Sequence, residues 1–262
     1  MTTNQIRFDD GAAYEQYMGK WSQLAGKTFL DWLAPAPGLR WLDIGCGNGA
    51  FTELLAQTCA PVSVHGIDPS AGQLAFAQQR QVAHLAQFSQ ADAMALPFPA
   101  ASFDVAVMPL VIFFVPDPGT GVAEMVRVVG PGGTVAAYAW DMFGGGFPYE
   151  LLNSEMRNMG MAVPRPPSPE ASRLEVMQEL WNSAGLKQVA TTEITVQRTF
   201  TDFGDYWRTV LGSPSAGANL AQMSQADIAV LKARLQEKLS IDSHGQITCS
   251  ASANAVKGIV AG

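Results

Sequence analysis

The segment Trp41-Leu42-Asp43-Ile44-Gly45-Cys46-Gly47-Asn48-Gly49 decides the fold of this chain of 262 residues. An apolar run leads into three alternate glycines, and a helical pattern over residues 50–58 follows. Glycine permits φ > 0 and lets a ligand approach the main chain closely. Any tight strand–helix turn would also explain a lone G-x-G. Two acids make the pattern more specific: Asp43 precedes the first glycine by two residues, and Asp68 ends the next apolar run about 20 residues on, where an acid typically binds ribose hydroxyls.

Apolar runs and helical patterns alternate around this turn. Runs of strand length occupy residues 40–44, 62–67, 86–89, 103–109 and 134–140, and helical patterns occupy residues 50–58, 70–83 and 120–129. Farther along, the patterns predict a helix over 171–184, a strand over 189–200, helical structure over 201–240 and a last strand over 246–260. Strands that alternate with helices are typical of βαβ units, so we expect an α/β fold with a mostly parallel sheet covered on both faces.

The composition excludes several classes of protein. With 48% hydrophobic and 15% charged residues, the chain has enough apolar material for a core and is not intrinsically disordered. The longest nearly unbroken apolar stretch, residues 105–115, is too short for a membrane span and contains Pro109. The N-terminus lacks the pattern of a secretory signal. Three cysteines without metal-ligand spacing indicate neither a disulfide framework nor a metal site, so we expect a reducing, cytoplasmic location.

Negative charge is concentrated around the glycine turn. The net charge is −7, from 16 basic and 23 acidic residues. Residues 41–126 contain seven of the acids and one base, Arg80, so this segment alone has a charge of −6. No basic stripe is present to neutralise a phosphate backbone, and nucleic acid is therefore not an expected partner. A segment of this charge favours a cationic ligand instead.

Four segments together resemble class I S-adenosylmethionine-dependent methyltransferases, in particular the type 11 group that includes ubiquinone- and menaquinone-biosynthesis enzymes. The segments are Asp43–Gly49, His65–Ser70 with Asp68, Ala91–Ala93 and Arg127–Gly133. The resemblance covers residues 40–140 and is faint beyond residue 141. It implies a Rossmann-like, doubly wound, mostly parallel seven-stranded sheet with helices on both faces and a small helical lid.

The resemblance also implies S-adenosylmethionine as the cofactor and S-adenosylhomocysteine as the product. The cofactor-binding residues that it implies are Tyr14, Trp21, Asp43, Gly45, Cys46, Gly47, Gly49, Asp68, Pro69, Asp92, Ala93 and Pro109. Asp68 would accept from two ribose hydroxyls and Asp92 from the adenine amine, although a helix N-cap explains Asp92 equally well. Cys46 is better explained as a small turn residue than as a nucleophile, and Asp104 as a structural residue that caps or pairs at the start of its strand.

The expected organisation is a single methyltransferase domain over residues 1–262. Helices in residues 1–37 would cover the cofactor, and residues 38–141 would form the core that binds it. Residues 142–170 and 201–245 would be lid insertions. Residues 171–200 and 246–262 would complete the sheet.

The chemistry needs few catalytic side chains. Methyl transfer from a sulfonium is an in-line displacement with an activated leaving group, so the protein mainly has to align the reactants. A general base is needed only where the acceptor arrives protonated. His65 is expected in the core and His84 in solvent, which leaves His244, near a candidate lid hinge, as the one histidine to consider for a catalytic role.

Acceptor contacts are expected from aromatic residues. Residues 108–114 offer no hydrogen-bonding side chain, which argues against a nucleobase amine as acceptor and is consistent with a dry wall beside the transferred methyl group. The insertions are rich in Met and aromatic residues, which adapt to apolar ligands, although core packing explains about half of them. We predict a small, largely apolar or aromatic acceptor, methylated on oxygen, carbon or nitrogen. The candidate contacts are Tyr17, Trp140, Phe147, Tyr149, Tyr206 and Trp207.

Two alternatives remain open from the sequence. An NAD(P)-dependent oxidoreductase also uses a glycine turn in a Rossmann-type sheet, but the G-x-G-x-G spacing and Asp43 argue against it. A non-catalytic module that binds S-adenosylmethionine would explain why no general base is evident.

Overall fold

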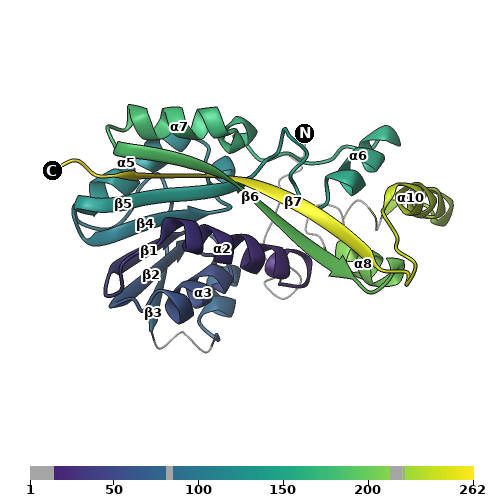
Figure 1. Cartoon of the computed structure of the whole chain (residues 1–262), viewed down its shortest axis with the longest axis horizontal. Helices are drawn as coiled ribbons and strands as arrows, with labels where there is room; N and C mark the ends of the chain where they lie inside the picture. The colour runs from purple at the N-terminus through teal and green to yellow at the C-terminus, as the bar shows by residue number, and fades with distance from the viewer. Residues whose placement is uncertain (1–14, 81–84, 213–219, 221) are drawn as a thin grey trace.

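The computed structural model describes residues 15–80, 85–212, 220 and 222–262 (Figure 1). Seven strands form one sheet in the order β3-β2-β1-β4-β5-β7-β6. Their bounds are β1 Arg40–Ile44, β2 Ser63–Asp68, β3 Ala86–Gln90, β4 Phe103–Pro109, β5 Val129–Trp140, β6 Lys187–Phe200 and β7 Ile247–Ile259. Strand β7 is antiparallel to both of its neighbours, and the other pairs are parallel. The predicted α/β fold with a mostly parallel, seven-stranded sheet is confirmed.

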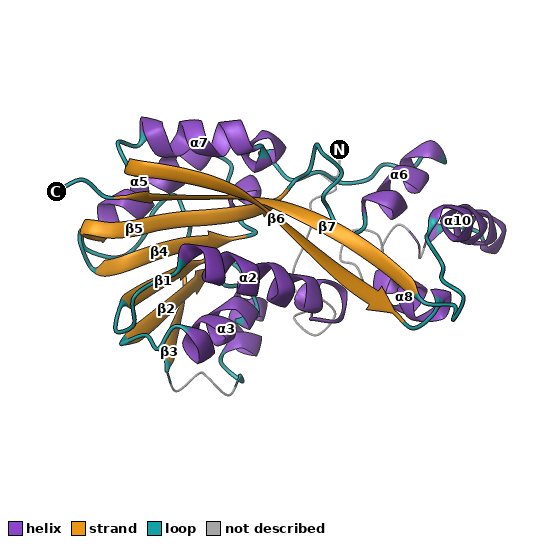
Figure 2. Ribbon diagram, in the orientation of Figure 1, coloured by secondary structure: helices purple, strands orange, loops and turns teal. Residues whose placement is uncertain are grey.

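Helices cover both faces of the sheet, as expected, with α2 and α3 on one face and α5 and α7 on the other (Figure 2). The helices are α2 Lys20–Leu33, α3 Ala50–Thr58, α4 Ala71–Ala77, α5 Pro118–Val128, α6 Glu150–Asn158, α7 Leu174–Ser183, α8 Phe203–Leu211 and α10 Gln225–Lys238. Shorter turns are η1 Glu15–Gly19, η3 Ile112–Phe114 and η4 Pro169–Ser172. Within these described ranges, no helix is both long and apolar enough to cross a membrane.

Some predicted boundaries are wrong for local reasons. Within the helical pattern over residues 201–240, the structure describes α8, which ends at Leu211 with Gly212 as its C-cap, and α10, whose N-cap is Ser224. The helix expected from residue 171 begins at Leu174, after the turn η4. Strand β5 begins at Val129, five residues early, because Val129 pairs with Phe103 before a register shift.

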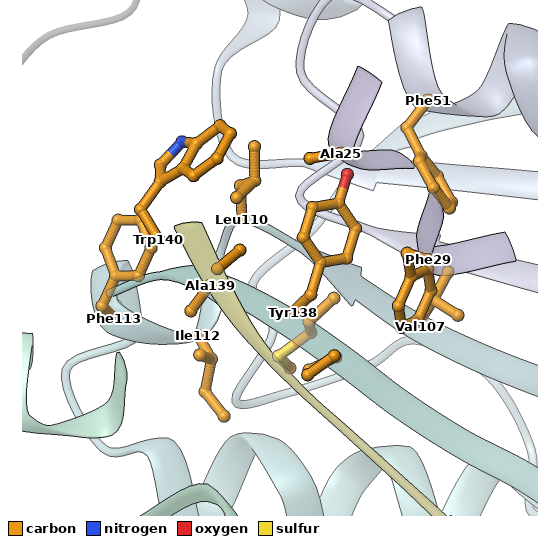
Figure 3. Close-up of a cluster of buried hydrophobic side chains, with 14 of the residues drawn as sticks. Ala25, Phe29, Phe51, Val107, Leu110, Ile112, Phe113, Tyr138, Ala139 and Trp140 are labelled. Carbon is orange, nitrogen blue, oxygen red and sulfur yellow. The ribbon is translucent and has the colours of Figure 1, made fainter. Parts of the chain in front are cut away.

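The core joins the sheet to α2 and α3. Buried residues of α2 recur at four-residue steps, Trp21, Ala25 and Phe29, as expected for a helix with one apolar face. The ring of Phe29 lies 4.7 Å from that of Tyr138 on β5, between centroids (Figure 3). This packing fixes α2 beside the carboxyl end of β5, where Trp140 terminates the strand.

The site is positioned by the strand order and by a long hairpin. Because the order reverses between β1 and β4, a ligand crevice is expected outside the carboxyl ends of these strands. Strand β7 pairs with β5 only over residues 253–259, and its first half pairs with β6 alone. Figure 1 shows α6, α8 and α10 gathered beside this protruding half of the hairpin, at the right of the view. These helices come from the two insertions that were expected to form a lid.

Candidate functional site

The glycine turn leaves room for a ligand at one position. Gly45, Gly47 and Gly49 all have positive φ, of 71°, 54° and 79°. A Cβ on Gly45 would collide with the side chain of Val111, and one on Gly49 would lie 3.0 Å from the Cβ of Ala77. A Cβ on Gly47 would meet nothing closer than the Oε1 of Gln73, at 4.0 Å. Packing within the protein therefore demands glycine at 45 and 49, whereas Gly47 borders open space.

Asp68 ties this turn to the end of β2. Its Oδ2 accepts a hydrogen bond from the Gly47 backbone N–H (3.0 Å), and its Oδ1 accepts one from that of Ser70 (2.8 Å). The carbonyl of Ile67 accepts from the N–H groups of Gly45 and Cys46. Burial raises the pKa of Asp68, and the two backbone donors oppose that rise. Each carboxylate oxygen has a second lone pair, so the half-buried Asp68 can accept two further hydrogen bonds.

Asp43 lies beneath the turn and is fully buried. Its Oδ2 accepts a hydrogen bond from the Thr52 hydroxyl (2.6 Å), while its Oδ1 has no hydrogen-bond partner in the described part of the chain. Burial raises the pKa of Asp43 to about 7, against the lowering effect of Thr52, and the charge of Asp68 adds to the rise. A buried oxygen without a donor carries a free-energy cost that a ligand's donor, direct or through water, would relieve.

The turn that follows β3 lies beside the end of β2. The Ala91 N–H donates to the Asp68 carbonyl (3.3 Å), which places Asp92 and Ala93 beside Asp68. Asp92 is exposed, and its Oδ1 accepts from the Met94 N–H (2.8 Å) to close a turn. The N-cap explanation of Asp92 is therefore wrong, since a turn and not a helix follows it. Pro69, which follows Asp68, is also exposed, and its carbonyl accepts from the Gln90 side-chain amide (2.8 Å).

Strand β4 supplies the opposite wall. After Pro109, Leu110 has a φ of 61°, and its N–H donates to the Tyr138 carbonyl (2.7 Å). A positive φ at a branched apolar residue is strained, and such strain concentrates at functional sites. The next residue, Val111, packs against Gly45. The sequence gives no sign of this strain, because leucine at a strand end normally signals core packing.

Three side chains have structural roles that the sequence predicts. Cys46 is buried, and burial raises the pKa of its thiol well above the ordinary value, as expected for an inert turn residue. Asp104 accepts two hydrogen bonds from the Arg40 guanidinium and one from the Arg40 N–H at the start of β4. His65 is half-buried on β2, where its Nε2 shares a hydrogen bond with the Ser89 hydroxyl (2.9 Å).

Of the two remaining histidines, the structure describes His244. His244 is exposed in the turn before β7, where its backbone N–H donates to Asp242 (2.8 Å). Within the described ranges, the hydrogen bonds of His244 do not reach the glycine turn. His84, and Tyr14 among the predicted cofactor contacts, lie outside the described residues.

Five of the six predicted acceptor contacts meet in one aromatic cluster. The aromatic cluster comprises Tyr17, Trp21, Phe147, Tyr149, Phe200, Phe203, Tyr206 and Trp207. The rings of Tyr17 and Tyr149 stack at 4.3 Å, and Tyr206 lies 6.3 Å from Tyr149, between centroids. Phe203 extends the contacts from Tyr206 to Trp207. The sixth predicted contact, Trp140, lies at the end of β5 beside Leu110 and Phe113 (Figure 3).

The hydroxyl of Tyr149 joins three distant segments. It donates to the Tyr17 carbonyl (2.7 Å) and accepts from the Trp21 Nε1–H (3.0 Å) and the Arg198 guanidinium (3.4 Å). The predicted cofactor contact Trp21 and the predicted acceptor contact Tyr149 are thus hydrogen-bonded to each other. Since this polar group is used within the protein, Tyr149 positions the N-terminal helix against the lid. Arg198 is a partner that the sequence does not predict, because it is a single base near the end of an alternating strand.

Ion pairs between a buried carboxylate and two half-exposed bases join the lid helices. Glu155 of α6 is 2% exposed, and its carboxylate accepts from Lys238 of α10 (2.6 Å) and lies 3.7 Å from Arg234. Lys238 holds the pKa of Glu155 below its ordinary value, despite the opposing effect of burial. These contacts fix α10 to α6.

Comparisons with known proteins match the segment that contains the glycine turn. The family model for the methyltransferase domain matches residues 42–137. A malonyl-(acyl-carrier protein) O-methyltransferase of Serratia marcescens is 33% identical over 110 residues, 42% of each chain. A demethylmenaquinone methyltransferase of Desulfitobacterium hafniense is 37% identical over 106 residues, 38% of this chain and 42% of that protein. The aligned segments therefore span about two fifths of these relatives' own length.

A solved structure extends the likeness to nearly the whole chain. The phosphoethanolamine N-methyltransferase 2 of Haemonchus contortus, solved in complex with S-adenosyl-L-methionine, is 20% identical and has a TM-score of 0.59. The match covers 98% of this chain and 58% of that one. At this identity the likeness shows the fold alone.

Proposed function

We propose that this chain transfers the methyl group of S-adenosylmethionine to a small, largely apolar acceptor. The premise is that residues 42–137 form a methyltransferase domain of the class I S-adenosylmethionine-dependent family. The supporting observation is the turn at Gly47. This glycine borders open space, and its backbone N–H donates to the carboxylate of Asp68. This arrangement fits an adenosyl ligand, because Asp68 retains lone pairs for two ribose hydroxyls. The buried Asp43 Oδ1 fits a ligand that brings a hydrogen-bond donor, directly or through water.

The bound cofactor would supply a methyl group on a positively charged sulfur. Asp92 would accept from the adenine amine with the carboxylate oxygen that does not close its turn. The charge of −6 over residues 41–126 favours the approach of a cation. In the aromatic cluster, the faces of Tyr17 and Trp21 would steady the sulfonium by cation–π attraction.

The chain's contribution to the reaction is to align the acceptor and exclude water. Leu110, Ile112 and Phe113 are each at most 8% exposed and give the β4 wall an apolar surface. Holding two reactants in line supplies a large part of the barrier reduction without a general base. The lid, joined to the N-terminal helix through Tyr149, would close the site over both ligands.

The experiment that tests this function is transfer of a labelled methyl group. Purified protein is incubated with S-adenosylmethionine labelled on the methyl group and a bacterial metabolite extract, and label in small molecules is counted. We expect incorporation with the wild type, loss with Asp68→Ala, and retention with Asp104→Ala, which disrupts only the structural pair with Arg40. Binding of S-adenosylhomocysteine without turnover in any extract would instead support a non-catalytic module.

A further inference from the structure

One polar group on the apolar wall has no partner. Trp140 is 2% exposed at the carboxyl end of β5, and its Nε1 forms no hydrogen bond within the described part of the chain. An indole nitrogen can only donate, and buried tryptophans usually find an acceptor. Leaving such a donor unpaired costs free energy, so its retention in a buried position needs an explanation.

Other buried tryptophans show that this feature is not general. Trp21 donates to the Tyr149 hydroxyl (3.0 Å), and Trp181 donates to the Val135 carbonyl (2.9 Å). The Nε1 of Trp41 is also unpaired within the described part of the chain, but Trp41 lies near the amino end of β1, whereas the glycine turn follows its carboxyl end. Trp140 is thus the unpaired indole on the carboxyl edge of the sheet.

The surroundings of Trp140 connect it to the glycine turn. Figure 3 shows its ring beside Leu110 and Phe113, with the indole nitrogen on the side away from Phe113. Leu110 continues the pairing of β4 with β5 through its bond to the Tyr138 carbonyl, and the side chain of the adjacent Val111 lies against Gly45. Trp140 therefore belongs to the wall that faces the predicted site of methyl transfer.

The nearest acid along the chain forms no hydrogen bond with the Trp140 indole. Asp141 follows Trp140, but its Oδ1 accepts from the N–H groups of Phe143 and Gly144 and so closes its own turn. The wall thus offers a donor without a matching carboxylate. Such a donor suits a ligand that carries a lone-pair oxygen.

We infer that the Trp140 Nε1–H binds a carbonyl or carboxylate oxygen of the acceptor, so that the acceptor is an apolar molecule that carries such a group. This inference rests on the proposed function, because it assigns the substrate class of the same site. Trp140 is then a specificity-determining residue whose hydrogen bond is completed only when the acceptor is bound.

The test compares three Trp→Phe variants that retain a large ring. Trp140→Phe removes the unpaired donor at the site, Trp41→Phe removes an unpaired donor away from it, and Trp181→Phe removes a paired one. In urea, Trp181→Phe should lower the unfolding midpoint more than Trp140→Phe, because only Trp181 loses a hydrogen bond. An equal or larger fall for Trp140→Phe would show that its N–H is already paired and would overturn the inference.

The second readout is labelled methyl transfer into an extract divided into acidic, neutral and basic solvent fractions. We expect label in the acidic or neutral fraction. Trp140→Phe should need about tenfold more of that fraction than the wild type to reach half of its maximal rate of labelling, as expected for the loss of about one buried hydrogen bond. The maximal rate itself should be unchanged. Trp41→Phe should match the wild type. A Trp140→Phe curve that superimposes on the wild type would overturn the inference while the methyltransferase function stands. No turnover of the wild type in any fraction would overturn both.

Discussion

Replacing Gly47 with alanine separates ligand binding from folding. In the protein alone, the added methyl group would lie 4.0 Å from its nearest neighbour, the Oε1 of Gln73, so it meets no obstacle. The remaining cost is the left-handed backbone, with a φ of 54°, which disfavours a residue with a Cβ by about 1–2 kcal/mol. For a chain of this size, each kcal/mol lowers the melting temperature by about 2–4 °C.

Gly132→Ala is the matched control. Gly132 lies near the start of β5 with a φ of 78°, and a Cβ there would meet nothing within 4 Å. Both variants should therefore lose the same 1–2 kcal/mol, roughly, in urea or thermal unfolding.

Only Gly47→Ala should impair ligand binding, because its methyl group enters the space that the cofactor approaches. By isothermal titration calorimetry, we expect its affinity for S-adenosylhomocysteine to fall roughly tenfold or more, at least about 1.4 kcal/mol. The affinity of Gly132→Ala should match the wild type. Wild-type affinity in a folded Gly47→Ala protein would refute the assignment of the open space above the turn to the cofactor.

Three further changes test other parts of the site. Asp68→Ala should weaken S-adenosylhomocysteine binding by about 1.5–3 kcal/mol in calorimetry, the range for hydrogen bonds to a charged group, and unchanged affinity would mean that the ribose lies elsewhere. Because the pKa of Asp43 is raised from 3.8 to about 7, the folded protein binds more protons than the unfolded chain in that interval, and the residue's contribution to stability falls as pH rises through it. Melting curves of Asp43→Asn should therefore show a smaller decline over the same pH range, and parallel curves would contradict the raised pKa. Tyr149→Phe should lower the free energy of unfolding in urea by about 1–3 kcal/mol, because its buried hydrogen-bond partners lose their acceptor or donor. Tyr206→Phe, whose hydroxyl has no partner among the described residues, should cost less, and the reverse order would contradict the role of Tyr149.

The sequence predicts the parts of the molecule that local patterns determine. The strand over residues 40–44, the glycine turn and the acid that ends β2 are adjacent or nearly adjacent features, and β1 and Asp68 have the predicted places. The helices on both faces follow equally from apolar periodicity. These features predict an α/β fold over residues 42–137, in which ligands bind outside the carboxyl ends of the strands.

Other features depend on contacts between distant residues. Tyr149 is 128 residues from Trp21 and 49 from Arg198, so no local pattern predicts the hydroxyl that joins them. The positive φ of Leu110 occurs where the chain leaves β4 and still bonds to Tyr138 of β5, a tertiary constraint that its side chain does not signal. Likewise, Trp140 is an ordinary apolar strand residue in the sequence, and only its unpaired Nε1 in the folded chain distinguishes it.

The central claim is that the turn at Gly47 and the carboxylate of Asp68 hold S-adenosylmethionine. Calorimetric titration of the wild-type protein with S-adenosylhomocysteine and, separately, with NADH tests this claim most directly. The account predicts saturable binding of S-adenosylhomocysteine at one site per chain and no binding of NADH. Binding of NADH without binding of S-adenosylhomocysteine would contradict the account and favour an oxidoreductase.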